Sequence, residues 1–212
     1  KTWKNSESLW LQALKINPKE PTALNNLGGY YYEMKNFEKS IPQFLSCIDN
    51  SENYLEVYRA YNNLGGAYKN LKKYDSALIA VNKSLELQPG LYESLFGKGL
   101  LMTEMQRFEE SEKIFTELLK TNPLNENVYY SRAMAYRANN KVDSAIMDYQ
   151  AAIRINPEYA EAYTNLGNIY FNQKVLPKAI ENYNQSLAIR PDGNTYLNRS
   201  KAFFFLNQYK EA

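Results

Sequence analysis

The sequence contains no histidine and only one cysteine, Cys47. The lack of histidine excludes imidazole acid–base catalysis, catalytic triads that use histidine, and most zinc sites. A single thiol excludes an internal disulfide and a thiolate cluster. The glycine-rich motifs that bind nucleotide phosphates are also missing. The sequence therefore predicts no catalytic residue, no metal and no cofactor, and we expect the chain not to be an enzyme.

Turn-forming residues are scarce as well, with 9 Gly and 8 Pro against 19 Tyr. So few turn residues argue against a many-stranded sandwich or barrel. No run of 18 or more apolar residues is present to form a transmembrane helix. The net charge of +2 is too small to favour nucleic-acid binding. We expect no nucleic-acid partner and no membrane insertion by this chain, and the sequence leaves the cellular compartment unknown.

Three groups of residues recur at a fixed spacing. Prolines recur every 34 residues, at Pro89, Pro123, Pro157 and Pro191. Leucine–glycine pairs hold a second position, at Leu27-Gly28, Leu64-Gly65 and Leu166-Gly167, and small residues hold a third, at Ala77, Ser111, Ala145, Ala179 and Ala212. Such periods indicate a repeat protein. We predict one array over 1–212, with full units at 21–57, 58–91, 92–125, 126–159 and 160–192 and partial units at 1–20 and 193–212, and expect it to be a piece of a longer array.

Each unit has the apolar pattern of two helices. In 58–91, one stripe contains Tyr61, Leu64, Gly65 and Tyr68, and a second runs from Tyr74 to Pro89, which ends it. One hairpin cannot bury both stripes, so neighbouring hairpins must stack. We predict first helices that begin near residues 21, 55, 92, 126, 160 and 193. Because Leu64 follows Leu27 by 37 residues, we also predict a longer turn and an extra helical turn from Tyr54.

The repeating pattern resembles the signature of the tetratricopeptide repeat, and the resemblance covers nearly the whole chain. The best copy contains Tyr163, Leu166, Gly167, Tyr170, Ala179, Tyr183 and Pro191. The resemblance implies an all-α, right-handed superhelical solenoid of antiparallel helix hairpins. It also implies a scaffold that holds a protein or peptide partner in a concave groove, although the groove residues do not identify that partner.

In this family the groove is lined by the stripe opposite the core stripe, which in 58–91 is Asn62, Asn63, Gly66 and Lys69. One groove slot repeats asparagine, at Asn26, Asn63, Asn165 and Asn198, and Asn168 is a further candidate binding residue of the groove. The series resembles the asparagine ladder of O-linked N-acetylglucosamine transferase, in which side-chain amides hold a peptide backbone. The alternative is that asparagine is simply common in this slot.

Groove slots of the middle units are apolar, at Phe96, Leu100, Tyr130 and Met134. They form either a pocket for a bulky partner side chain or contacts with a neighbouring helix. We expect Tyr130 to face away from the core stripe of its helix, which contains Tyr129, Ala133 and Tyr136.

Two further resemblances bear on the partner. The chaperone-binding subclass uses a clamp of Lys, Asn and Arg, but the matching slots hold Asn25, Gly29, Asn63, Glu93 and Gly97, which argues against a clamp. Residues 3–10 resemble the junction between membrane helix and repeats in transmembrane O-mannosyltransferase-type proteins. The alternative function is therefore a non-catalytic accessory domain of a membrane glycosyltransferase-like protein, on the extracytoplasmic side. Neither end carries a polar cap, so self-association through the ends is also expected.

Overall fold

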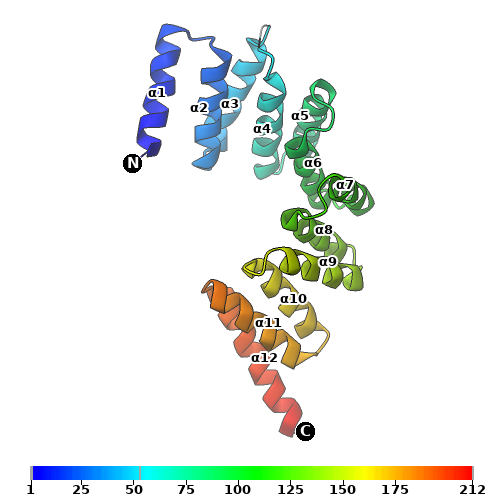
Figure 1. The fold of residues 1–212 in the computed structure, drawn as a ribbon. Coiled ribbons are helices and arrows are strands. Elements are labelled where there is room, and N and C mark those ends of the chain that lie inside the picture. The colour runs from blue at the N-terminus through cyan, green and yellow to red at the C-terminus, as the bar shows by residue number, and fades with distance from the viewer. Residues whose placement is uncertain (1, 53, 212) are drawn as a thin grey trace. The chain divides into compact units, whose positions relative to one another are not determined.

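A computed structural model describes residues 2–52 and 54–211, with side chains for 7–52 and 54–207. The described residues form twelve α-helices and no β-strand, which confirms the all-α prediction (Figure 1). They divide into two compact units, one ending at Met105 and the other beginning at Gln106. The first contains α1 (Thr2–Ile16), α2 (Pro21–Glu33), α3 (Phe37–Asp49), α4 (Val57–Asn70), α5 (Tyr74–Leu87) and α6 (Tyr92–Glu104). The second contains α7 (Phe108–Thr121), α8 (Glu126–Ala138), α9 (Val142–Ile155), α10 (Ala160–Asn172), α11 (Leu176–Ile189) and α12 (Gly193–Glu211).

The helix starts agree with the repeat spacing except at one place. The first helices of the units begin at residues 21, 92, 126, 160 and 193 as predicted, but α4 begins at Val57, so the predicted extra helical turn from Tyr54 is wrong. The three additional residues lie in the connection 50–56. Polar side chains at the end of α3 account for this, because Asn50 Nδ2 donates to the Ser46 carbonyl at 2.8 Å and Ser51 Oγ to the Ile48 carbonyl at 2.7 Å. The same two carbonyls also accept the backbone N–H groups of Asn50 and Ser51, both at 3.2 Å, so the side-chain bonds reinforce the end of the helix at this point.

Each turn within a hairpin contains one non-glycine residue in the left-handed backbone region. The φ angles are 57° at Lys35, Lys72 and Asn140, 59° at Gln106 and 63° at Lys174. In the α4–α5 turn, Lys72 N donates to Lys69 O and Lys73 N to Tyr68 O, both at 2.9 Å. This pair of bonds is the Schellman motif that closes a helix C-terminus. It reverses the chain within residues 71–73, between the end of α4 and the start of α5, and thereby makes the hairpin antiparallel.

The two helices of a hairpin approach closely where the leucine–glycine pairs meet the second helix. A Cβ added at Gly28 would lie 2.6 Å from a Phe44 ring carbon, and one at Gly167 would lie 2.7 Å from the Tyr183 ring. Atoms of a real side chain cannot approach so closely, so the glycines are required by packing. The fixed spacing of these pairs in the sequence is therefore a packing requirement.

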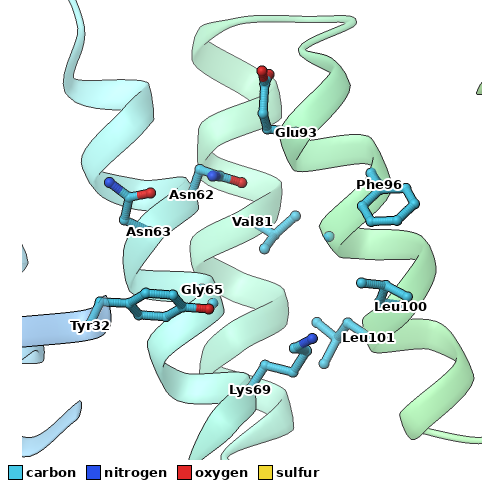
Figure 2. A pocket seen from close by; sticks show the side chains of 12 residues that line it. Tyr32, Asn62, Asn63, Gly65, Lys69, Val81, Glu93, Phe96, Leu100 and Leu101 are labelled. Atoms are coloured by element: carbon cyan, nitrogen blue, oxygen red, sulfur yellow. The ribbon is translucent and has the colours of Figure 1, made fainter. Parts of the chain in front are cut away.

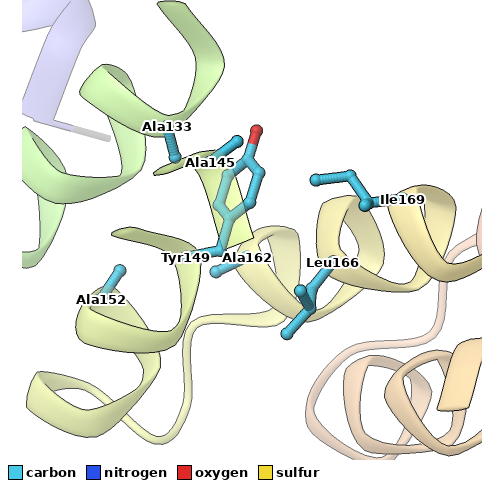
Figure 3. Packing of buried hydrophobic residues seen from close by; sticks show 7 residues of the cluster. All are labelled: Ala133, Ala145, Tyr149, Ala152, Ala162, Leu166 and Ile169. Carbon is cyan, nitrogen blue, oxygen red and sulfur yellow. The ribbon is translucent and has the colours of Figure 1, made fainter. Parts of the chain in front are cut away.

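The core lies between successive helices and uses aromatic side chains. In the second unit, a cluster joins α8, α9 and α10 and contains Ala133, Ala145, Tyr149, Ala152, Ala162, Leu166 and Ile169 (Figure 3). Tyr149 is fully buried at its centre. Partly buried tyrosines surround the cluster, at 129, 130, 136, 159 and 170. Much of the tyrosine excess is therefore core packing. None of the helices in the described part of the chain has the length and apolar character needed to cross a bilayer.

Candidate functional site

The first unit contains a pocket of about 280 Å³ between α4 and α6, which we call the α4–α6 pocket (Figure 2). Helix α4 contributes its polar and glycine side, and α6 contributes its apolar side. Tyr32 of α2 and Val81 of α5 close the wall. The lining residues are Tyr32, Asn62, Asn63, Gly65, Gly66, Lys69, Val81, Glu93, Phe96, Gly97, Leu100 and Leu101. Three of the predicted groove residues, Asn63, Phe96 and Leu100, therefore line one pocket.

Glycine shapes the pocket wall at one position. A Cβ at Gly66 would lie 3.1 Å from the Tyr32 hydroxyl, whereas Gly97 faces open space. The absence of a side chain at Gly66 lets Tyr32 of the preceding hairpin reach α4. Asn70 Nδ2 then donates to the Tyr32 hydroxyl at 3.1 Å. The ring of Tyr32 is fixed as a wall of the pocket.

Asn62 and Asn63 each use one of the two polar groups of the side-chain amide in a hydrogen bond within the protein. Asn63 Nδ2 donates to Asn25 Oδ1 at 3.3 Å, and Asn62 Oδ1 accepts from Ser94 Oγ at 3.0 Å. Among the described residues, these bonds leave the carbonyl of Asn63 and the amino group of Asn62 for other partners. One acceptor and one donor side by side match the two groups of a peptide unit.

A second hollow of about 270 Å³ adjoins the first. It is lined by Asn25, Tyr58, Arg59, Asn62, Asn63, Leu91 and Glu93. It shares Asn62, Asn63 and Glu93 with the α4–α6 pocket. The first unit therefore carries one continuous groove along α2, α4 and α6.

Two charges of opposite sign line the α4–α6 pocket. Lys69 is half-buried and Glu93 is exposed. Burial lowers the pKa of the Lys69 ammonium, and the carboxylate of Glu104 opposes this. Figure 2 shows Lys69 and Glu93 at opposite ends of the pocket, with Phe96 and Leu100 along one side between them.

In the second unit, Tyr130 does not face away from the core. It packs against the α8–α10 cluster with Tyr129 and Tyr136, and its ring stacks on Tyr159 at 4.9 Å between centroids. The prediction that Tyr130 faces away from the core stripe is therefore wrong. Adjacent positions on a helix can both be buried when the next hairpin supplies a large side chain, and Tyr159 supplies it here. Burial raises the pKa of the Tyr130 hydroxyl.

Three of the remaining candidate asparagines, Asn165, Asn168 and Asn198, form hydrogen bonds within the second unit. Asn165 Nδ2 donates to the Tyr130 hydroxyl at 2.9 Å. Asn168 Oδ1 accepts from Asn198 Nδ2 at 3.0 Å and from the Tyr183 hydroxyl at 2.8 Å. Tyr130 and Asn165 line a polar hollow of about 200 Å³ together with Glu161, Thr164, Ser186, Arg190, Asp192 and Thr195. Asn26 is half-buried on α2.

Met134 occupies the position that Asn168 holds one repeat later. It is partly buried and packs against the α8–α10 cluster. Tyr149 occupies the position of Tyr183, but its buried hydroxyl has no acceptor for its proton among the described residues. The nearby Arg137 guanidinium acts to lower the pKa of Tyr149 against the effect of burial, but a guanidinium can only donate to the hydroxyl. The Tyr183 hydroxyl, in contrast, is bound by Asn168. The missing acceptor at Tyr149 is thus explained by methionine in place of an amide.

The predicted apolar patch falls in two units, with Phe96 and Leu100 in the first and Tyr130 and Met134 in the second. Phe96 and Leu100 line the α4–α6 pocket, whereas Tyr130 and Met134 make the alternative contacts with neighbouring helices in the α8–α10 cluster. A partner-binding role stays a prediction for each pair. The sequence does not predict Tyr32 or Lys69 as binding residues. Tyr32 reaches the pocket from the preceding hairpin, whereas Lys69 lies in the predicted groove stripe. In the sequence, only the missing side chain at Gly66 indicates that a residue of a neighbouring helix, here Tyr32, packs against α4 at this position.

Three family models match the chain. Two described as "Tetratricopeptide repeat" match residues 19–90 and 160–192, and one described as "TPR repeat" matches 133–174. The chain is 29% identical over 119 residues to the Hsp70-Hsp90 organizing protein of Triticum aestivum, covering 54% of this chain and 20% of that protein. It is 24% identical over 207 residues to the human Protein O-mannosyl-transferase TMTC3, covering 89% of this chain and 22% of that protein. It thus spans about a fifth of the length of these curated relatives.

Solved structures share the fold. A tetratricopeptide repeat protein from Parabacteroides merdae has a TM-score of 0.76 at 21% identity, covering 95% of this chain and 78% of that one. YrrB, described as a TPR protein with an unusual peptide-binding site, has a TM-score of 0.63 at 17% identity, covering 91% and 97%. At these identities the likeness concerns the fold alone.

Proposed function

Because the chain belongs to the tetratricopeptide repeat family, we propose that it is a scaffold that binds a segment of another protein along its first helices. The observation that carries the proposal is the continuous groove of the first unit, where amides that are only half used lie beside an apolar wall. The volume of about 280 Å³ is slightly below the range of about 300–1,000 Å³ usual for small-molecule sites. It suits one or two side chains of a peptide.

The proposed role is non-catalytic. Titratable groups in the groove are few and separated, and no group of three or more metal-ligating side chains occurs among the described residues. The names of two similar proteins support a binding role, since one organizes Hsp70 and Hsp90 and the other has a peptide-binding site. The recurring prolines keep a spacing of 34 residues from Pro89 in the first unit to Pro191 in the second, which supports treating 1–212 as one array.

The test is selection of random peptides by display on phage, followed by affinity measurement against two variants. Leu100→Glu places a charge in the apolar wall and should weaken selected peptides about tenfold or more, as loss of a central contact typically does. Ile79→Glu is the matched control, because Ile79 lies on α5 and is 71% exposed. Thermal melts establish that both variants fold. Failure to select peptides, or equal binding to both variants, contradicts the proposal.

A second candidate has its own supporting observation. The similarity to the human O-mannosyl-transferase extends over 89% of this chain, so the repeats could serve as an accessory domain of a membrane glycosyltransferase-like protein. In that case the groove would bind the acceptor protein. The sequence of the full-length protein decides: several apolar spans of about 20 residues favour this candidate, and further repeats in their place favour the scaffold.

A further inference from the structure

Four cations among the described residues are half-buried, Lys69, Lys98, Arg132 and Arg199. Arg199 donates to Asn184 Oδ1 at 2.7 Å, and of the two lysines only Lys69 lines the α4–α6 pocket. The guanidinium of Arg132 is bonded to both carboxylate oxygens of Asp148, at 2.7 and 2.9 Å. Lys69 is also half-buried, but its ammonium makes no hydrogen bond or ion pair with any residue in the described part of the chain. Its burial is opposed only by the more distant carboxylate of Glu104. A desolvated charge without a partner is costly to a protein, and an incoming anion relieves that cost.

The position of Lys69 places this cation inside a binding surface. Lys69 comes from the last turn of α4 and lines the α4–α6 pocket with Phe96 and Leu100 of α6. Figure 2 shows its side chain at the end of the pocket next to Leu101. An anion bound there would be within the same pocket as an apolar group bound on α6.

Glu93 and Lys69 give the two ends of the pocket opposite charges. Glu93 is exposed, so water screens its charge more than that of Lys69. A ligand with one negative group is attracted at the Lys69 end and is repelled only weakly at the other. A dianionic phosphate would need several donors, and Lys69 is the only basic residue lining the pocket. The arrangement favours a single carboxylate.

We infer that the α4–α6 pocket selects partner segments that carry an acidic side chain, bound by Lys69, close to an apolar side chain, bound against Phe96 and Leu100. The amides of Asn62 and Asn63 then hold the backbone between the two. This inference rests on the proposed function and adds to it the class of sequence that is recognised.

The probe is a set of capped hexapeptides of alanine and serine in which one phenylalanine is fixed and a scanned position carries Asp, Asn or Lys. Acetylated and amidated ends remove terminal charges. For the wild-type chain, Asp peptides should bind about fivefold or more tightly than their Asn counterparts, because ionised hydrogen bonds are about twice as strong as neutral ones. Lys peptides should bind most weakly.

Variants assign the effect to one side chain. Lys69→Met should make Asp and Asn peptides bind equally, and Lys69→Glu should reverse the order so that Lys peptides bind best. Lys83→Met is the matched control, since Lys83 on α5 is a lysine paired with Glu86 at the surface, and it should keep the wild-type order. Thermal melts of each variant exclude unfolding.

Failure of this inference is separable from failure of the proposed function. If Asp and Asn peptides bind the wild-type chain equally but Leu100→Glu weakens both, the groove binds peptides and the acidic preference is wrong. If Lys69→Met retains the preference, the assignment to Lys69 is wrong. If no hexapeptide binds and display also selects none, the proposed function and this inference both fall.

Discussion

The contrast between Tyr149 and Tyr183 shows how one residue sets the hydrogen bonding of a repeat. Both hydroxyls are buried with their rings, but only Tyr183 has an amide, Asn168, in reach. We predict that Met134→Asn raises the free energy of unfolding by about 1 kcal/mol, because a buried donor gains its missing acceptor. Urea unfolding measures the change. Met134→Leu is the control, and an Asn variant no more stable than the Leu variant would refute the pairing.

A buried ion pair joins α8 to α9. Arg132 and Asp148 are 15% and 8% exposed, and Arg132 Nη1 also donates to Thr116 at 2.9 Å. The rings of Tyr129 and Tyr136 lie 5.6 and 5.7 Å from the guanidinium carbon. Few routes exist for water to replace a lost partner in such a site.

Removing either charge alone should therefore be severe. Arg132→Leu or Asp148→Leu should each cost about 3–5 kcal/mol of stability, because a buried charge is left unpaired. The double substitution should cost less than either single one. Urea unfolding of the wild type, the two single variants and the double variant gives the four free energies of a double-mutant cycle. If the stability losses of the single variants add up to that of the double variant, the two charges are not coupled.

At the scale of elements, the turns within hairpins retain a removable strain. Lys72 has φ 57° and is exposed, so its side chain contributes no packing that glycine would lose. A left-handed residue other than glycine costs about 1–2 kcal/mol, and glycine loses about 0.5–1 kcal/mol more backbone entropy than alanine on folding.

We accordingly predict that Lys72→Gly stabilises the chain by roughly 0.5–1 kcal/mol, whereas Lys72→Ala does not. Asn140→Gly should gain less, because asparagine tolerates this backbone region. Melting temperatures of the three variants provide the comparison. Equal shifts for the glycine and alanine variants of residue 72 would show that the turn is unstrained.

For the molecule as a whole, large apolar side chains remain uncovered on α12. Tyr196, Leu197, Phe203 and Phe204 are 47%, 54%, 44% and 61% exposed. Repeat arrays normally cover such faces with a polar terminal helix. We predict that the chain 1–212 self-associates as its concentration rises, measured by sedimentation equilibrium. Leu197→Lys with Phe204→Lys should shift it toward monomer, while Ile79→Lys on α5 should not; a monomer at all concentrations contradicts the prediction.

Much of the fold could be predicted because repetition multiplies a weak signal. The prolines recur at one position of the repeat and the leucine–glycine pairs at another. The glycines are needed there because a Cβ would not fit against Phe44 or Tyr183. The insertion before α4 could not be placed, because three added residues change the spacing equally in a loop or in a helix. Hydrogen bonds of Asn50 and Ser51 decide it.

The site was predictable only in part, because burial of a groove residue depends on its neighbours. Asn63, Phe96 and Leu100 line one pocket as their helical spacing suggested. Lys69 is indistinguishable in sequence from a solvated lysine at the end of a helix, and its burial arises only from packing in the folded chain. Tyr130 was misjudged because Tyr159, 29 positions later, covers it.

The connection between α3 and α4, residues 50–56, is where we expect a protease to cut the folded chain. Leu55 is 93% exposed there, and exposed loop tips are preferred sites of proteolytic cleavage. The helices on either side remain packed, since Phe44 of α3 shares a buried cluster with Leu64 of α4 and Ala80 of α5. A single cut should therefore leave two pieces that stay together under native conditions and separate in denaturant. If the two pieces are expressed separately, each fused to one half of a split reporter protein, their association should restore the activity of the reporter.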